Sequence, residues 1–168
     1  MERLREKAAS LGVSLNDAQL AQFEKYYEML VEKNKVMNLT AITEKEEVID
    51  KHFADSLAII KTNVFLDGKK LLDLGTGAGF PGIPLKIAFP KSEILLMDSL
   101  NKRIKFLHEV IEELDLDGIS AIHGRAEDFA KKKEYRETFD YVVYRAVADL
   151  AVLSEYCMPY VHTGGYFL

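Results

Sequence analysis

The stretch Asp73-Leu-Gly-Thr-Gly-Ala-Gly-Phe-Pro-Gly82 decides the fold of this chain. It continues a short apolar run that begins at Lys69, and glycines end that run in the way typical of a β-strand. Glycine lets the backbone turn sharply and approach a ligand, because it has no Cβ. Ligands of parallel sheets bind outside the carboxyl ends of the strands. The stretch therefore predicts a ligand-binding turn, with a purely structural glycine turn as the less favoured alternative.

Apolar runs and helical patterns alternate after this turn. Further strands are predicted at 93–99, 119–123 and 139–144, with a fifth beginning at Gly165, and helices are predicted over 104–114, from 127, and over 150–160. Strands that alternate with helices are typical of βαβ crossovers. The predicted fold class is α/β with a parallel sheet.

The chain before residue 64 has a different character. It holds one glycine and no proline, and its apolar residues recur at helical spacing. Ser14 is a predicted N-cap for one helix, and Thr43 with Glu46 forms a predicted capping box for another. The sequence therefore predicts an N-terminal helical subdomain over 1–63 and an α/β domain over 64–168.

Composition limits where the protein acts. The 168 residues are 48% hydrophobic and 29% charged, and no apolar run approaches the roughly 20 residues that cross a membrane. The first residues lack the apolar core of a signal peptide. The single cysteine, Cys157, suits a reducing compartment, and the four histidines have no metal-ligand spacing. We expect a cytoplasmic protein with no metal and no membrane attachment.

The charge balance gives no sign of a basic arm. The chain has 22 basic and 27 acidic residues, for a net charge of −5. Any contact with RNA must therefore come from a local cluster of cations. The sequence says nothing about oligomeric state.

Two ligands fit the glycine turn. The segment 77–82 matches the G-x-G-x-x-G pattern of dinucleotide sites, which is a weak signal alone. The pattern Asp73-x-Gly75-x-Gly77-x-Gly79, with an acid two residues before the first glycine, instead resembles motif I of class I S-adenosylmethionine-dependent methyltransferases. Asp98 ends the second strand, where it could accept bonds from the ribose of either cofactor, or could merely cap the next helix.

Several segments together resemble one family. They are Asn38–Thr40, His52–Leu57, Gly75–Leu85, Asp98–Leu107, Gly124–Asp128 and Tyr144–Ala146. They resemble the RsmG family of bacterial 16S rRNA guanine-N7 methyltransferases, formerly called glucose-inhibited division protein B. The resemblance implies a class I methyltransferase domain, with a Rossmann-like parallel sheet, behind a helical N-terminal subdomain. It also implies S-adenosylmethionine as cofactor and 16S rRNA, or the small ribosomal subunit, as partner.

The predicted cofactor site combines the motif with the resemblance. The resemblance implies cofactor-site positions at Gly75, Phe80, Ala126, Glu127 and Arg145. The glycine turn and the second strand add three further residues, Gly77, Gly79 and Asp98. An amide and a carboxylate at 126–127 could read adenine, although Glu127 could also simply favour a helix N-terminus.

Lys102, Arg103 and Arg125 are predicted to bind the RNA substrate. They follow the second and third strands, and so share the sheet edge that carries the cofactor. Cations there suit phosphate contacts, although each one alone could be an ordinary solvated charge. Reversing the charge of Arg103 is predicted to weaken RNA binding with little effect on the cofactor.

No catalytic residue is assigned. Guanine N7 carries a free lone pair, so methylation there requires no proton removal, and positioning can supply most of the catalysis. His52, Asp55 and Ser56 have the spacing of one helix face. On physical grounds they are predicted to form a surface network, whereas the family resemblance implies contacts with substrate or between the two domains.

Two rival functions remain open. They are a nicotinamide-dependent oxidoreductase that uses 77–82 and a non-catalytic module that binds an adenosine ligand. Domains of the resembled family continue past the strand that begins at Gly165. We therefore expect a C-terminally incomplete domain that lacks its last strands, with impaired activity and an edge prone to self-association.

Overall fold

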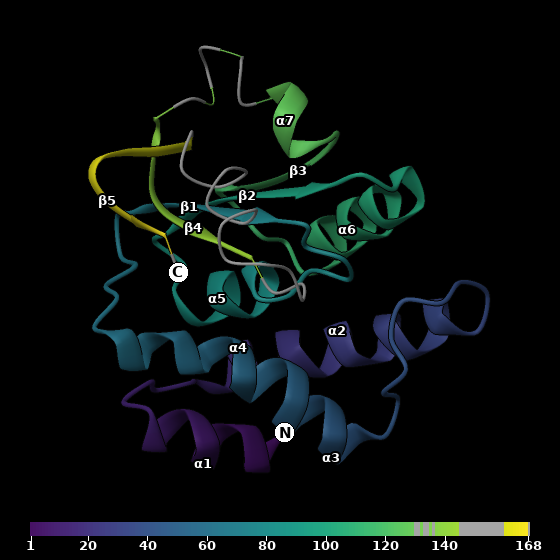
Figure 1. The fold of residues 1–168 in the computed structure, drawn as a ribbon. Helices are drawn as coiled ribbons and strands as arrows, with labels where there is room; N and C mark the ends of the chain where they lie inside the picture. Colours follow the sequence, from purple (N-terminus) through teal and green to yellow (C-terminus); the bar gives the residue numbers. More distant parts are fainter. Residues whose placement is uncertain (130–131, 133–134, 136, 145–159, 168) are drawn as a thin grey trace.

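Five parallel strands form the centre of the molecule (Figure 1). The computed structural model describes residues 1–129, 132, 135, 137–144 and 160–167. The strands are β1 (Lys70–Leu74), β2 (Glu93–Asp98), β3 (Ile119–His123), β4 (Phe139–Val143) and β5 (Val161–Phe167). Their order in the sheet is β3-β2-β1-β4-β5, and every neighbouring pair runs parallel. The predicted α/β class is confirmed.

Four strands lie where the sequence predicts them, and the fifth differs. β5 begins at Val161, four residues before the predicted start at Gly165. Its pairing with β4 shifts register, because Phe139 pairs with Val161 whereas Tyr141 pairs with Tyr166. This irregular pairing explains why the predicted start of β5 is wrong. A strand whose pairing is interrupted lacks the regular alternation of apolar and polar residues by which strands are recognised in a sequence.

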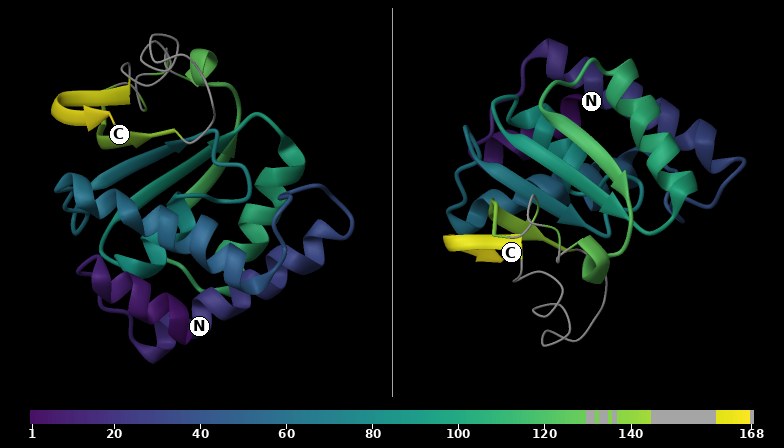
Figure 2. Two further views of the ribbon diagram at one scale, coloured as in Figure 1. Left: turned by 60° about the horizontal axis from the view of Figure 1, so that its bottom comes forward. Right: turned by 90° about the horizontal axis from the view of Figure 1, so that it is seen from above.

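The strand order creates a switch point between β1 and β4. The chain passes from β1 through α5 (Gly82–Ala88) to β2, and through α6 (Asn101–Glu113) to β3. After α7 (Ala126–Phe129) it returns to the other side of β1. Figure 2 shows the strands side by side from above. Ligands of open α/β sheets bind where the order reverses, at the carboxyl ends.

The N-terminal part is helical and lies beneath α5 in Figure 1. Its elements are α1 (Glu2–Ser10), α2 (Asp17–Asn34), α3 (Lys45–Val48), the π-helix η1 (Ile49–Ala54), α4 (Asp55–Leu57) and the 3-10 helix η2 (Ala58–Thr62). Within the described residues, no helix is long and apolar enough to cross a membrane. A helix predicted over 150–160 falls, apart from Tyr160, outside the described residues, as does Cys157.

Both predicted helix caps are wrong. α2 is capped by Asn16, whose side chain accepts a bond from the amide of Gln19 while the Gln19 side chain accepts from the Asn16 amide. This reciprocal pair is a capping box, which Ser14 cannot form from its place two residues earlier. α3 begins after Glu44 without any side-chain cap, so Thr43 does not fill that role.

One hydrophobic core joins the N-terminal helices to the sheet. It includes Leu4, Phe23 and Phe53 from the helices together with Leu71 and Leu96 from the strands. Neighbouring side chains in β1 alternate between this core and a second one on the opposite sheet face, as the two-residue period of a strand requires. The proposed boundary at residue 63 therefore does not divide the larger core.

The ring of Phe53 is central to that core. It is fully buried and lies 5.1 Å from the Phe23 ring, 5.4 Å from the Tyr26 ring and 6.1 Å from the Phe80 ring, between centroids. Phe53→Ala should lower the free energy of unfolding by about 3–5 kcal/mol. Urea unfolding followed by far-UV and near-UV circular dichroism checks this, and the two signals should change together because the core is shared.

Phe65→Ala is the matched control. Phe65 is 65% exposed, so its truncation should change the free energy of unfolding by less than about 0.5 kcal/mol. Equal losses in the two variants would contradict the central place of Phe53.

Candidate cofactor site

The glycine loop turns back toward the end of β2. The amides of Gly75 and Thr76 both donate to the carbonyl oxygen of Met97, at 2.9 and 3.0 Å. Gly75 has φ +69°, and a Cβ there would stand 3.2 Å from Cε2 of Tyr144. Only glycine combines this backbone conformation with so close a neighbour. The loop backbone therefore packs closely against the Tyr144 ring at the end of β1.

The Asp73 side chain bonds to residues near both ends of the glycine loop. Its carboxylate is fully buried, and Oδ2 accepts bonds from Oγ1 of Thr76 at 2.6 Å and from the amide of Gly82 at 2.9 Å. Gly82 is the first residue of α5, so Asp73 occupies the N-terminus of that helix. Dinucleotide sites place a pyrophosphate at the equivalent helix end. A buried carboxylate repels such a group, so this loop disfavours a dinucleotide.

Asp98 joins the loop to α6. Its side chain is 3% exposed, and its oxygens accept bonds from the amides of Gly77 and Leu100, both at 2.9 Å. Nη1 of Arg103 lies 3.4 and 3.5 Å from the same two oxygens. Leu100 is the N-cap of α6, and that helix has no side-chain cap, so Asp98 binds the turn before the helix and does not cap the helix itself. A carboxylate has about four acceptor positions, so hydroxyl groups could still bind.

A pocket of about 370 Å³ opens at the carboxyl ends of β1 to β4. It is lined by Leu74, Gly75, Met97, Asp98, Ser99, Arg103, Gly124, Arg125, Ala126, Glu127 and Tyr144. The pocket lies at the switch point of the sheet, which is where a ligand of this fold class is expected. It brings together six of the residues that the sequence assigns to cofactor or RNA.

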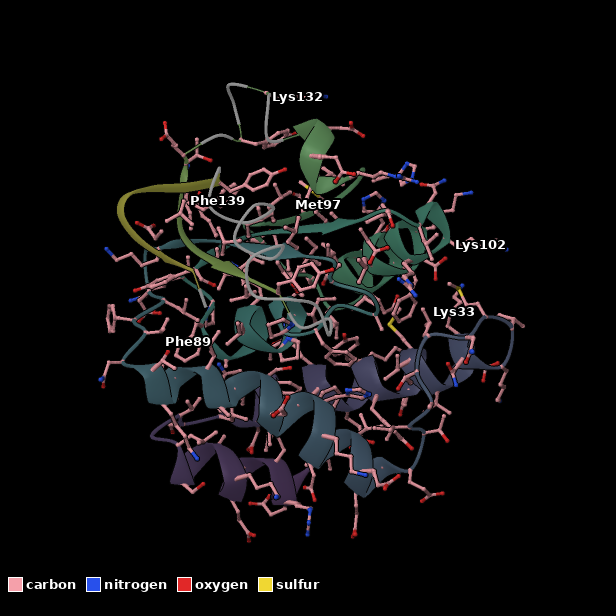
Figure 3. The ribbon with its side chains drawn as sticks, viewed as in Figure 1. Lys33, Phe89, Met97, Lys102, Lys132 and Phe139 are labelled. Atoms are coloured by element: carbon pink, nitrogen blue, oxygen red, sulfur yellow. The ribbon has the colours of Figure 1, made fainter. Side chains whose placement is uncertain are left out.

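The other assigned residues lie outside this lining. Phe80 is 7% exposed and packs against the N-terminal helices, and Gly79 lies against Ile83 and Tyr26. Gly77 contributes its amide to Asp98. Figure 3 shows Lys102 on the outer side of α6, away from Met97 in the sheet, and Lys102 is exposed. Arg145 lies outside the described residues.

Two tyrosines of the site were missed by the sequence analysis. Tyr144 lines the pocket directly after β4, and its strand-end position, like that of Asp98, could have indicated it. The buried Tyr160 donates its hydroxyl hydrogen to the carbonyl oxygen of Ala126 at the start of α7. No local signal in the sequence pairs residues 34 positions apart.

The predicted triad of His52, Asp55 and Ser56 does not form a surface network. Residues 49–54 follow a π-helix, whose wider turn changes the spacing that an α-helix would give. Ser56 is buried, and its hydroxyl donates to the carbonyl oxygen of His52. The His52 ring instead faces Phe80, so this helix contacts the glycine loop.

Metal-ligating side chains do not cluster within the residues that the structure describes. No three His, Cys, Asp or Glu side chains gather there in a way that could hold an ion. The site consists of backbone amides, carboxylates, guanidinium groups and a tyrosine ring.

Solved structures share this fold. A methyltransferase from Aquifex aeolicus, described as dependent on S-adenosylmethionine, superposes with a TM-score of 0.58 and 18% identity, over 82% of this chain and 70% of that one. A Pyrococcus horikoshii protein, TYW2 in complex with MeSAdo, superposes with a TM-score of 0.55 and 16% identity, over 64% of this chain and 40% of that one. At such identities the likeness establishes the fold alone, which is the class I methyltransferase fold.

Sequence comparisons identify the family. A family model described as rRNA small subunit methyltransferase G matches residues 19–168. Proteins named ribosomal RNA small subunit methyltransferase G are 64% identical in Lachnoclostridium phytofermentans, over 95% of this chain, and 53% identical in Clostridium tetani, over 98% of it. The chain spans 66% and 69% of the lengths of these two relatives. With its fold, its glycine loop and these matches, the chain belongs to the rRNA small subunit methyltransferase G family.

Proposed function

We propose that this chain methylates N7 of a guanine in the 16S rRNA of the small ribosomal subunit, with S-adenosylmethionine as methyl donor. The observation that carries the proposal is the pocket at the switch point, which combines Gly75, Asp98, Ala126 and Glu127. Membership of the family supplies the reaction class. The buried Asp73 carboxylate at the start of α5 argues against the nicotinamide rival.

The pocket residues fit an adenosine ligand. Asp98 has acceptor capacity for ribose hydroxyls beyond the bonds that it receives from the protein. The backbone at Ala126 and the carboxylate of Glu127 can bond to the adenine edge. Gly75 lines the pocket with backbone alone, beside the Tyr144 ring. When bound, S-adenosylmethionine supplies a methyl group on a positively charged sulfur, and the residues of the chain hold and orient it.

The reaction requires little chemistry from the side chains. Guanine N7 has an unshared electron pair in the plane of the base and no hydrogen to remove, so no general base is assigned. The chain then acts by holding the base and the cofactor in line, which converts an encounter into a unimolecular step. Bases in single-stranded or looped RNA can be turned into such a pocket.

Cations near the pocket are proposed to bind the RNA backbone. Arg125 is exposed at the pocket and Lys102 is exposed on the outer side of α6. Arg103 is half-buried and faces Asp98, so it belongs as much to the cofactor site as to the RNA surface. The substrate implies action in the cytoplasm.

The central experiment is methyl transfer from labelled S-adenosylmethionine to purified small ribosomal subunits. The protein from Lachnoclostridium phytofermentans provides the positive control. Strand cleavage at the methylated base, after reduction and treatment with aniline, identifies N7 as the position. Calorimetric titration with S-adenosylhomocysteine and with NAD runs in parallel. Binding of NAD in place of S-adenosylhomocysteine would support the oxidoreductase. Binding of S-adenosylhomocysteine without transfer would support either the non-catalytic module or the impaired activity expected of a domain that lacks its last strands.

Gly75→Val should abolish measurable binding of S-adenosylhomocysteine. A branched side chain at φ +69° is strained, and its Cβ meets Tyr144 at the wall of the pocket. Isothermal calorimetry measures the loss. Gly12→Val is the matched control, since Gly12 has φ +83° with open space around it and lies in the N-terminal segment. It should cost stability without changing affinity, and equal affinity in the two variants would refute the assignment of the loop.

Lys102→Glu should weaken RNA binding and reduce the slope of log affinity against log salt by about 1, as expected for a lost phosphate contact. Cofactor affinity should not change, because Lys102 does not line the pocket. The control is Lys91→Glu, an exposed lysine just before β2, at the opposite edge of the sheet. Filter binding at several salt concentrations gives the slopes, and identical slopes in both variants would show that Lys102 is only a solvated charge.

Because Arg103 contacts Asp98, an Arg103 variant is expected to affect cofactor binding as well as RNA binding. Reversing its charge would place two carboxylates together at the pocket, so cofactor affinity should fall as well. The sequence alone predicts that this variant leaves cofactor affinity nearly unchanged. The structure instead predicts that it lowers both RNA affinity and cofactor affinity. Measuring S-adenosylhomocysteine affinity of Arg103→Glu by calorimetry tests it, with unchanged affinity as the contrary result.

A further inference from the structure

The glycine loop is held from outside by the N-terminal helices. Tyr26 of α2 is fully buried, and its hydroxyl donates to the carbonyl oxygen of Ala78 at 2.6 Å. Its ring lies 5.6 Å from the ring of Phe80, between centroids. A buried hydroxyl usually pairs, because desolvation without a partner is costly. Here the partner is the loop, 52 residues away in sequence.

A second contact comes from η1. The rings of His52 and Phe80 are stacked, with centroids 4.4 Å apart and planes inclined by 9°. On the other side, Nε2 of His52 lies 2.9 Å from Oγ1 of Thr40, which also accepts a bond from the amide of Ile42. The histidine ring is thus fixed at its edge by the segment after α2. Single π-helical turns frequently occur at functional sites.

These two contacts limit where the loop can lie. Gly79, with φ +107°, lies so close to Tyr26 that an added Cβ would stand 2.7 Å from the tyrosine hydroxyl. On the strand side, the loop is tied by the bonds of Gly75 and Thr76 to Met97. Its segment 78–80 is therefore bounded on the helix side by Tyr26 and His52.

We propose that Tyr26 and His52 are positioning residues for the cofactor. They hold residues 78–80 so that the pocket side of the loop has its binding shape before the ligand arrives. The inference rests on the proposed function, because it concerns the same pocket. Binding sites that are already ordered gain affinity by avoiding the cost of ordering. Loss of either contact should then lower cofactor affinity although neither residue lines the pocket.

Tyr26→Phe tests the hydroxyl alone. It keeps the ring and leaves the carbonyl of Ala78 without the tyrosine donor, so S-adenosylhomocysteine should bind about tenfold more weakly in calorimetry. Tyr27→Phe is the matched control, since the neighbouring hydroxyl donates to Thr43 at 2.9 Å in an exposed position away from the loop. Its affinity should stay within about twofold of the unsubstituted chain.

His52 variants test the stacked ring. His52→Phe keeps an aromatic ring against Phe80 and should retain affinity within about threefold, whereas His52→Leu should lose about tenfold. Rescue by phenylalanine is a result that a general loss of stability would not give. Val110→Ala, in a buried position late in α6, lowers stability away from the loop and should bind normally at a temperature where all variants are folded.

The outcomes separate the two proposals. An unsubstituted chain that fails to bind S-adenosylhomocysteine overturns the proposed function, and this inference with it. If the unsubstituted chain binds but Tyr26→Phe and His52→Leu bind equally well, the positioning role is wrong and the proposed function stands. If Val110→Ala also binds S-adenosylhomocysteine more weakly, in proportion to its loss of stability, the positioning role would likewise be overturned. Selective weakening in Tyr26→Phe and His52→Leu supports it.

Discussion

The buried carboxylate of Asp73 holds together the two ends of the glycine loop. One oxygen accepts from Thr76, near the start of the loop, and from Gly82, where α5 begins. A buried charge is tolerated only with such partners, and a negative charge at a helix N-terminus is favourable. This constraint sets the position of α5, against which the N-terminal helices pack. It also fixes the loop at the end of β1, where the backbone of Gly75 lines the pocket beside Tyr144.

The N-terminal helices are part of the same folded unit as the sheet. Phe53, Tyr26 and Phe80 come from three separate segments, yet their rings meet in one core. A core of this kind couples the folding of the first 63 residues to the shape of the cofactor loop. The coupling gives these helices a role at the pocket, in addition to burying apolar surface.

Local patterns explain which parts of the site could be predicted. The glycines, Asp73 and Asp98 carry their signal in spacing, because each occupies the end of a strand whose apolar run is visible in the sequence. The sequence could not separate loop glycines that face the pocket from those that face the core. Phe80 illustrates this, since its match to the family gives a position in the motif but not the direction of its ring. Helix caps failed for a related reason, because several polar residues compete locally and the reciprocal bond with Gln19 decides in favour of Asn16.

By itself, the sequence determined the α/β class, the parallel sheet, the glycine turn and the two acids beside it, Asp73 and Asp98. All of these follow from the periodicity of apolar residues, turn chemistry and short-range spacing. Only the tertiary structure decided that Tyr26 and His52 hold the loop, that Tyr144 and Arg103 both line the pocket, and that one core spans both parts of the chain. These contacts join residues far apart along the chain. Their geometry depends on how the helices pack over α5 and on the order of the strands, which no local pattern encodes.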